Sequence, residues 1–531
     1  MRVRGVRPGH GRRLSSPLKR LSVLPSLVTG LLLLLTGCGL LTGCGGGDGA
    51  VGESPLHVRV LAIHDFHGAL RPATHGWSEG RLMGGAAALK AVMDSLEAAC
   101  ACPTVRVDGG DQLQGTLESN LLHGAPVVAA FNYIGLDAAA IGNHELDWGV
   151  DTLLVRQRES RYEWLAANVF RRDSGERPEW ATPFAVVERD GVKVGIVGYA
   201  TVSTPYTLRP EVTAPYEFRS GYAAIRDALE GVRRVGADFV VVVAHAGGDC
   251  NGGQCAGEVV DLAEELPVGS VHMIAGGHIH APGAGLVDSV PIVRAGSHGR
   301  AVAVVDLYRH ADGTHGFSLS TAPVIADVGS GDAGDEDAGG ADAAMADLLA
   351  PYLAVADSIG RVPVTTLNEP LSASATGDRR LGQLIADAVR AVAAADFGMH
   401  NPGGVRADLP RGLVSYRDLH RVLPFGNAVV RLTLTGRQLQ ELVSRTGPRY
   451  YLSNLIVEWD PAAASEAGGA RLRFVDGAPV EADRSYTLAT NDFLADGGDG
   501  LAVLTSLPRV VIGVTVLDAV AGHLSAWPDD W

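Results

Sequence analysis

Five short clusters of metal-binding side chains occur between residues 65 and 280, each just after a run of residues typical of a strand. They contain two aspartates, one asparagine and five histidines: Asp65, His67, Asp111, Asn143, His144, His245, His278 and His280. A single His or Asp at a strand end is usually a structural hydrogen bonder. Five clusters in the same position indicate a metal site instead, because ligands gather at the carboxyl ends of strands in open α/β sheets.

This donor set suits a pair of divalent cations. Two cations about 3.5–4 Å apart need a bridging carboxylate between them and neutral imidazoles at the other positions. Mixed His, Asp and Asn ligands are typical of Zn, Mn or Fe. Such a pair lowers the pKa of a bound water and holds phosphoryl oxygens, so the pattern predicts hydrolysis of a phosphate ester.

The elements that must position these residues alternate between strands and helices. Helical patterns include 84–99, 150–159 and 221–235. Val- and Ile-rich runs between them predict a layered α/β domain over residues 56–326, with helices covering a sheet. The expected strands are His57–His64, Thr104–Asp108, Ala138–Ile141, Val192–Gly198, Asp238–Ala244, Val271–Ala275, Val290–Val293 and Ala301–Leu307.

A change in composition separates this domain from a second one. Residues 327–358 are expected to form an acidic linker, with a short helix near 341–350 that ends before Pro351. A calcium loop is disfavoured because the aspartates lack EF-hand spacing. Residues 359–531 then show a helical pattern at Arg380–Ala395 and strand-like runs at Val429–Leu434, Asn454–Glu458, Ser485–Ala489 and Val510–Val516.

Three segments of the second domain have the residue types of a substrate site. Asn401 and Arg406 flank a glycine turn, and a planar guanidinium suits phosphate or ribose oxygens. Phe425 and Phe493 each lie in polar, turn-rich surroundings, and Asp499 follows the second of them. Two such rings indicate a stacking site for a planar base, although phenylalanines under a loop are as often core residues.

The first 55 residues predict export. Residues 1–37 combine a basic stretch with a leucine-rich run, which is typical of a secretory signal. Cys38 follows in a lipobox-like pattern that repeats at Cys44, so we expect a lipid anchor, with Cys38 favoured, and a flexible tether over 38–55. An ordinary signal peptide is the alternative. The chain would then be an exported lipoprotein that faces the periplasm or the cell surface.

The remaining four cysteines are expected to form disulfides in that compartment. Cys250 and Cys255 enclose a short glycine-rich loop and are the preferred pair, whereas zinc binding by the four cysteines is disfavoured by their spacing. The formal net charge of −16 argues against a nucleic-acid partner.

The order of the five clusters resembles the calcineurin-like metallophosphoesterases. Within them, residues 55–531 are most similar to the 5′-nucleotidase family, which includes bacterial UDP-sugar hydrolases and ecto-5′-nucleotidases. The resemblance implies a four-layer α/β/β/α domain followed by a smaller α/β substrate-binding domain. It also implies that Asp111 bridges two metals, that His144 and Asp147 are the catalytic pair, and that the other ligands are Asp65, His67, Asn143, His245, His278 and His280.

The same resemblance assigns the second domain to substrate binding. Phe425 and Phe493 would clamp the base, while Asn401, Arg406 and Asp499 would bind base, phosphate or ribose groups. One departure concerns an arginine that the family places before a helix start. The expected position falls on or near Gly377, and Arg379 or Arg380 is the candidate replacement.

The expected activity is hydrolysis of nucleoside 5′-phosphates to nucleoside and phosphate. A 2′,3′-cyclic-nucleotide phosphodiesterase with 3′-nucleotidase activity and a UDP-sugar diphosphatase are alternatives with the same metal site. A thiosulfohydrolase and a non-catalytic nucleotide-binding lipoprotein are further alternatives. The preferred nucleotide, the metals and the oligomeric state stay open.

Overall fold

The computed structural model describes residues 55–531 except 76, 252–253, 327–341, 375–376, 460–469 and 527–531. The predicted signal peptide, Cys38, nearly all of the tether and residues 327–341 of the acidic linker lie outside the described residues.

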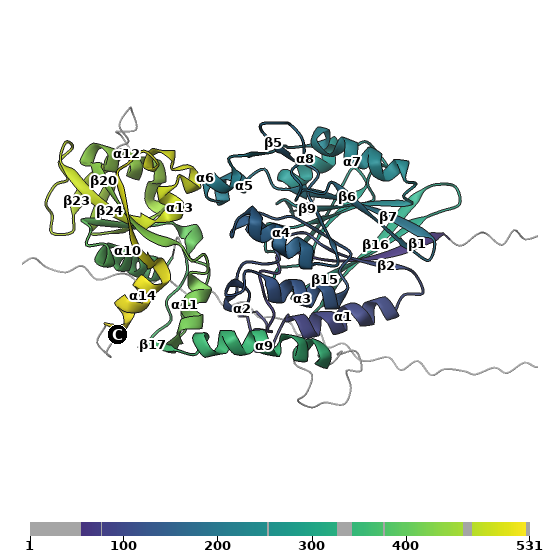
Figure 1. Cartoon of the computed structure of the whole chain (residues 1–531), viewed down its shortest axis with the longest axis horizontal. Coiled ribbons are helices and arrows are strands. Elements are labelled where there is room, and N and C mark those ends of the chain that lie inside the picture. Colours follow the sequence, from purple (N-terminus) through teal and green to yellow (C-terminus); the bar gives the residue numbers. More distant parts are fainter. Residues whose placement is uncertain are drawn as a thin grey trace, which may run out of the picture. The chain divides into compact units, whose positions relative to one another are not determined.

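Two six-stranded sheets form the centre of the first domain (Figure 1). The first sheet has the order β16-β15-β1-β2-β3-β4, and β1 to β4 run parallel to one another. The second has the order β13-β14-β12-β9-β7-β6, with parallel strands from β14 to β7. The strands of the first sheet are β1 (Leu56–Ile63), β2 (Thr104–Asp108), β3 (Ala138–Ala140), β4 (Glu163–Leu165), β15 (Ala301–Arg309) and β16 (His315–Pro323). Those of the second are β6 (Phe184–Arg189), β7 (Val192–Ala200), β9 (Phe239–His245), β12 (Met273–Gly276), β13 (Gly283–Val287) and β14 (Val290–Arg294).

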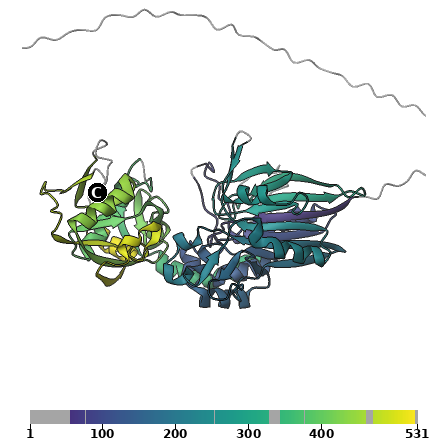
Figure 2. The same ribbon diagram turned by 90° about the horizontal axis from the view of Figure 1, so that it is seen from above.

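Three apolar cores hold these elements in four layers. One core lies between the sheets and includes Val60, Val107 and Val241. The other two join the outer face of each sheet to helices. The helices on the first sheet are α1 (Ala86–Ala98), α3 (Ala125–Ile134) and α4 (Val150–Glu159), and those on the second are α7 (Tyr222–Arg234) and α8 (Glu258–Glu265). Figure 2 shows the strands of this domain side by side. The predicted α/β/β/α architecture is therefore confirmed, because continuous Val and Ile runs bury both faces of the parallel strands.

Short elements fill the connections of this domain. They are α2 (Leu117–Asn120), β5 (Val169–Arg171), α5 (Thr204–Thr207), α6 (Pro210–Thr213), β8 (Tyr216–Phe218), β10 (Asp249–Asn251) and β11 (Gln254–Ala256).

The cysteines lie in two of these connections. Cys100 and Cys102 form a disulfide between α1 and β2. The backbones of Cys250 and Cys255 face each other across the β10–β11 ladder, and Cys255 is disulfide-bonded. The pairing of Cys250 with Cys255 stays a prediction.

The second domain is built on a five-stranded sheet of order β21-β18-β24-β20-β25, with an apolar core on each face. Its strands are β18 (Phe397–His400), β20 (Ala428–Thr435), β21 (Tyr451–Ser453), β24 (Ser485–Asn491) and β25 (Arg509–Thr515). The helices are α10 (Arg380–Val392), α11 (Tyr416–Val422), α12 (Gly436–Thr446), α13 (Asp492–Ala495) and α14 (Val516–Ser525). Two small ladders complete it, formed by β17 (Pro363–Leu367) with β19 (Gly412–Ser415) and by β22 (Leu455–Trp459) with β23 (Ala470–Phe474).

Helix α9 (Ala343–Gly360) corrects one expectation. The predicted helix near 341–350 does not end before Pro351 but continues through it for nine more residues. Packing against α1, α2, α3 and α11 stabilises the helix beyond the proline, with Met345, Leu349 and Ala356 buried. Among the described residues, α9 alone has the length and apolar composition of a membrane span. These contacts bury only part of its apolar surface, and Leu348, Val355 and Ile359 stay exposed.

Candidate active site

The parallel strands of both sheets end at the same edge of the first domain. Asp65 and His67 follow β1, Asp111 follows β2, and Asn143 follows β3. In the second sheet, His245 ends β9, while His278 and His280 follow β12. The five clusters predicted from the sequence therefore come together in space, because parallel strands share the direction of their carboxyl ends.

One group of donors consists of Asp65, His67 and His280, whose ligand atoms all lie within 4.8 Å of one another. The Nε2 atoms of the two histidines are 3.0 Å apart, and each is 3.6 Å from Asp65 Oδ1. That oxygen is buried without a hydrogen-bond partner among the described residues. Since His67 Nδ1–H donates to the carbonyl of Gln114, its Nε2 carries a lone pair toward the group. Facing lone pairs beside an unpartnered carboxylate oxygen fit a cation.

A second group consists of Asp111, His245 and His278, whose ligand atoms also lie within 4.8 Å of one another. His245 Nε2 lies 3.0 Å from Asp111 Oδ2 and 3.1 Å from the side-chain oxygen of Asn143. Its Nδ1–H donates to the carbonyl of Gly109, so Nε2 is the nitrogen that faces Asp111 and Asn143.

Asp111 lies between the two groups. Its Oδ2 is 3.0 Å from His245 Nε2 and 3.9 Å from His67 Nε2, while Oδ1 accepts the backbone N–H of His144. One carboxylate oxygen thus faces both histidine sets, which is the arrangement that a bridging ligand requires.

The electrostatics of the site reflect these contacts. Burial opposes a charge on His245, but the neighbouring Asp111 carboxylate outweighs it and raises the pKa of His245 to about 10. Burial and the nearby His67 lower the pKa of His280 to about 3. Burial and His245 likewise lower the pKa of His278 to about 4. Two of the imidazoles are therefore neutral near pH 7, the form that binds metals.

Glu145 supports the Asp111 loop and was not singled out in the sequence. Its buried carboxylate accepts the backbone N–H groups of Gly142, Asp111 and Gln112 at 2.7–2.9 Å. A Cβ on Gly142 would lie 2.2 Å from Asp111 Oδ1, so only glycine fits at that position.

His64 is a second supporting residue that the sequence reasoning missed. The backbone N–H of Gly296 donates to His64 Nε2 at 2.8 Å, so the proton of the ring lies on Nδ1. This Nδ1–H donates to Asp65 Oδ2 at 2.5 Å. His64 is 1% exposed and fixes the orientation of the Asp65 carboxylate, with Oδ1 toward the two histidines. Its position next to Asp65 is the only signal that the sequence offers.

The backbone at four predicted ligands lies in the left-handed region. The φ angles are 48° at Asp65, 51° at His67, 57° at Asp111 and 69° at His278. Non-glycine residues hold this conformation at a cost of about 1–3 kcal/mol each, which persists only where the surroundings fix it. Such strain concentrates at functional sites.

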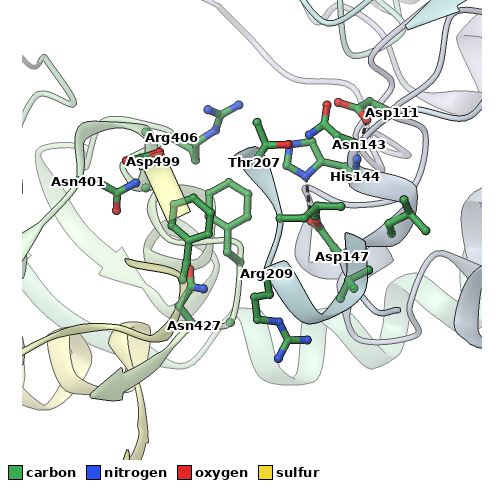
Figure 3. Close-up of a pocket in the computed structure, with 18 of the residues that line it drawn as sticks. Asp111, Asn143, His144, Asp147, Thr207, Arg209, Asn401, Arg406, Asn427 and Asp499 are labelled. Carbon is green, nitrogen blue, oxygen red and sulfur yellow. Dashed lines mark hydrogen bonds and ion pairs between the residues drawn. The ribbon is translucent and has the colours of Figure 1, made fainter. Parts of the chain in front are cut away.

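His144 and Asp147 form a pair beside the donors. His144 Nδ1 lies 2.9 Å from Asp147 Oδ2 across one turn of a 3₁₀ helix (Figure 3). Burial opposes protonation of His144, but Asp147 and Asp111 outweigh it and raise its pKa to about 9. The ring of His144 is 5.4 Å from that of His67 and stacks at 5.7 Å on Phe425, which comes from the second domain.

A pocket of about 530 Å³ joins this pair to residues of the second domain. In Figure 3, Asp111, Asn143 and His144 lie on one side, and Asn401, Arg406 and Asp499 lie on the other. Phe425 and Phe493 also line the pocket, and the Arg406 guanidinium lies 5.7 Å from the centre of the Phe425 ring. Apart from Arg379 and Arg380, every residue predicted to bind substrate therefore lies in the same pocket as candidate metal ligands.

Arg379 and Arg380 are not brought into this pocket. They line a separate pocket of about 440 Å³ on α10. Arg380 pairs with Asp378 and Glu369, and Arg379 donates to the carbonyl of Tyr450. These contacts engage both guanidiniums outside the pocket that contains Phe425 and Asp499, and a role of either arginine in substrate binding stays a prediction.

The pocket also contains residues that no motif revealed. The segment with α5 and α6 contributes one wall, and residues near Phe425 and Phe493 contribute another. These additional lining residues are Trp148, Thr207, Leu208, Arg209, Val212, Asn427 and Asp492. Most come from connections, where neither periodicity nor spacing signals a role.

Comparison with known proteins supports this arrangement. Residues 358–506 match the family model of the 5′-nucleotidase C-terminal domain, and residues 95–287 match that of the bacterial capsule synthesis protein PGA_cap. Protein UshA of Yersinia enterocolitica is 27% identical over 86% of this chain and 89% of its own length. The crystal structure of a 5′-nucleotidase precursor from Thermus thermophilus, 24% identical, has a TM-score of 0.75 and covers 88% of this chain and 96% of its own. Residues 358–506 thus match a 5′-nucleotidase C-terminal domain, and the chain as a whole is similar to 5′-nucleotidases.

A 5′-nucleotidase of Vibrio cholerae is 26% identical over 86% of this chain, and these likenesses indicate a metal-dependent phosphoester hydrolase. A further relative, endonuclease YhcR of Bacillus subtilis, is 29% identical over 83% of this chain, but the chain spans only 37% of that protein.

Proposed function

We propose that this chain is an exported dimetal phosphohydrolase that cleaves nucleoside 5′-phosphates to nucleoside and phosphate. One observation carries the proposal: a single pocket is lined both by candidate metal ligands and by Phe425, Phe493 and Asp499. A substrate that spans this pocket has a phosphate at one end and a planar ring at the other, which describes a nucleotide.

The donor chemistry fits two divalent cations, of Zn, Mn or Fe. Asp65, His67 and His280 would hold one cation, while Asn143, His245 and His278 would hold the other, and Asp111 would bridge them. When bound, such a pair polarises the phosphoryl group and makes a hydroxide available near neutral pH.

His144 supplies the proton in this mechanism. Asp147 holds the proton of His144 on Nδ1 and favours the imidazolium form, which agrees with the raised pKa of His144. As the bond to the leaving group breaks, His144 stabilises the negative charge that develops and protonates the nucleoside oxygen.

The second domain would bind the nucleoside part of the substrate. Phe425 and Phe493 would stack on the base, Arg406 would bind phosphate or ribose oxygens, and Asn401 and Asp499 would bind polar groups of the nucleoside. Asp499 Oδ2 already accepts the hydroxyl of Tyr450 at 2.8 Å, which holds its carboxylate in the pocket. Stacking tolerates many bases, so we expect a broad base specificity.

Export and a lipid anchor at Cys38 complete the proposal. The basic stretch, the leucine-rich run and the lipobox-like pattern support it. Labelling cells with a radioactive fatty acid tests it, because Cys38→Ala should abolish the label on the chain. Label that persists there and disappears only in Cys44→Ala would move the anchor to Cys44.

Nuclease activity is a second candidate, favoured by the 29% identity to endonuclease YhcR. The net charge of −16 opposes it, because nucleic-acid binding relies on basic surfaces.

A hydrolysis panel, read out by phosphate release and by chromatography of the products, separates these possibilities. The purified chain would be tested on AMP, UDP-glucose, 2′,3′-cyclic AMP, ATP and single-stranded DNA, with and without chelator. We expect chelator-sensitive release of phosphate from AMP. Preferred cleavage of the cyclic nucleotide, the nucleotide sugar or DNA would replace the proposed substrate, and activity that survives exhaustive dialysis against chelator would refute the dimetal site.

A further inference from the structure

A second cluster of metal-binding side chains lies at the opposite edge of the first sheet. His57 is the second residue of β1, Cys100 and Cys102 precede β2, and Asp306 lies on β15. One ligand atom of each lies within 4.8 Å of the others. Because β1 has eight residues and rises about 3.3 Å per residue, about 25 Å separates this cluster from Asp65. The cluster is therefore independent of the candidate active site.

The imidazole of His57 points into the cluster. Its Nε2 is buried and lies 3.2 Å from Asp306 Oδ1, but it makes no hydrogen bond to any described residue. The ring stacks on Tyr308, the residue opposite it on β15, with 4.5 Å between the ring centres. Stacking fixes the ring, so a nitrogen without a hydrogen bond is held beside two sulfur atoms and a carboxylate.

Asp306 is held in a similarly fixed position. Its two oxygens accept hydrogen bonds from Nε and Nη2 of Arg59, both at 2.9 Å. Arg59 also donates to the carbonyl of Leu96 in α1, which ties the pair to the helix before Cys100.

The two cysteines are joined as a disulfide in the structure. Two thiolates, one imidazole and one carboxylate are a four-donor set of the kind that holds zinc in tetrahedral sites. We propose that reduction of the Cys100–Cys102 disulfide converts this cluster into a zinc site ligated by His57, Cys100, Cys102 and Asp306. The site would tie β1, β15 and the segment before β2 together.

The charges balance in both states. In the disulfide state, Asp306 and Arg59 neutralise each other. In the zinc state, two thiolates and one carboxylate exceed the charge of Zn²⁺ by one negative charge, which the Arg59 guanidinium offsets. Partly buried charges that are paired in this way avoid most of the desolvation penalty.

The exchange needs a reductant, and a dithiol meets the requirement. It transfers two electrons and two protons to the Cys100–Cys102 bond, which breaks to give two thiols, while the dithiol becomes a disulfide. Zinc binding forms two Zn–S bonds and releases the two thiol protons. Exchange with a disulfide, which accepts two electrons and becomes a dithiol, re-forms the Cys100–Cys102 bond, removes two ligands and expels the metal.

Cobalt substitution tests the proposal, because only thiolate ligands give Co²⁺ an intense near-ultraviolet charge-transfer band. The whole chain would be reduced with a phosphine, freed of it under anaerobic conditions and titrated with Co²⁺. We expect three equivalents of metal and the charge-transfer band in the reduced chain, against two equivalents and no band in the oxidised chain. The donors of the candidate active site are nitrogen and oxygen, so they produce no such band.

Variants assign the ligands. Substituting both Cys100 and Cys102 by Ser should remove the band and the third equivalent, and His57→Ala should weaken the third equivalent at least 10-fold. The matched control substitutes Cys250 and Cys255 by Ser and should keep both. Thermal unfolding of each variant checks that it is folded. Two equivalents in reduced wild type, or a band that depends on Cys250 and Cys255, would overturn the proposal whether or not the chain hydrolyses nucleotides.

Discussion

At the scale of single residues, the candidate site is defined by which nitrogen of each histidine faces inward. His67 and His245 use Nδ1–H to hold backbone carbonyls, which leaves Nε2 for the cluster. His144 differs, because its Nδ1 pairs with the carboxylate of Asp147. These contacts distinguish the proposed ligand histidines from the proposed proton donor within one site.

Replacing His144 tests that separation. His144→Ala should lower turnover about 10²–10⁴-fold, because it removes the proton donor to the leaving group. Metal content measured by elemental analysis should stay at two equivalents, since His144 is not among the proposed ligands. Turnover equal to that of wild type would exclude His144 from the mechanism.

Replacing His64 tests the support of Asp65. His64→Ala should weaken one of the two metal equivalents about 10–100-fold, because nothing would then hold the Asp65 carboxylate in place. Chelator competition measures this loss directly, without an activity assay.

The conservative variant His64→Asn serves as the control. Its side-chain N–H can replace His64 Nδ1–H, so it should recover most of the affinity. Equal affinity in the alanine variant and in wild type would show that His64 is only a core residue.

At the scale of elements, all eight strands that the sequence predicted for the first domain are present in its two sheets. The donors meet because the parallel strands that they follow end at the same edge. Thr104–Asp108 matches the prediction in both bounds, and Val192–Ala200 extends it by two residues. The acidic segment was harder to predict, since Pro351 indicated a helix end. A proline removes one backbone hydrogen bond, and the packing of α9 against α1, α2, α3 and α11 outweighs that loss.

His272, which lies directly before β12 and contacts β9, predicts a pH effect on the stability of the fold. His272 Nδ1 accepts the backbone N–H of Val240, and burial followed by the nearby His315 lowers the pKa of His272 to about 4. An unfolded histidine has a pKa near 6.5, so the unfolded state binds more protons between these values. The contribution of His272 to the free energy of unfolding is thus complete above pH 6.5 and is lost as the pH falls toward 4.

Urea denaturation at pH 7 and pH 5 measures this effect. His272→Asn keeps an acceptor for Val240 but cannot be protonated, so its loss of stability between the two pH values should be smaller than in wild type. An equal loss in both proteins would assign the acid sensitivity to other groups.

At the scale of the whole molecule, the pocket contains donors from the first domain and rings from the second. Contacts between the domains accompany it: Gln114 and Asn120 both donate to the carbonyl of Pro424, next to Phe425. Asp357 of α9 accepts from Arg71 of the first domain and from Arg417 of the second. Neither domain alone presents a complete nucleotide site.

Replacing Phe493 tests whether the second domain binds the nucleobase while the first domain provides the metal ligands. Phe493→Ala should raise KM for AMP about 5–150-fold, because stacking on a base contributes about 1–3 kcal/mol. Hydrolysis of p-nitrophenyl phosphate, which lacks a nucleobase, should change less than 3-fold. A similar loss with both substrates would show that Phe493 supports the structure of the pocket and not recognition of the base.

The sequence by itself determined which donors exist and that each follows a strand, because β-branched runs, glycines and their neighbouring Asp and His residues are local features. It also revealed the rings and polar groups of the second domain. Only the tertiary structure decided which atoms meet. Sheet register brings His57 and Asp306 to Cys100 and Cys102, loop packing turns His64 toward Asp65, and local ion pairs direct Arg379 and Arg380 elsewhere. Contacts between residues hundreds of positions apart depend on how the sheets and helices pack on one another. The spacing of residues along the sequence does not predict that packing.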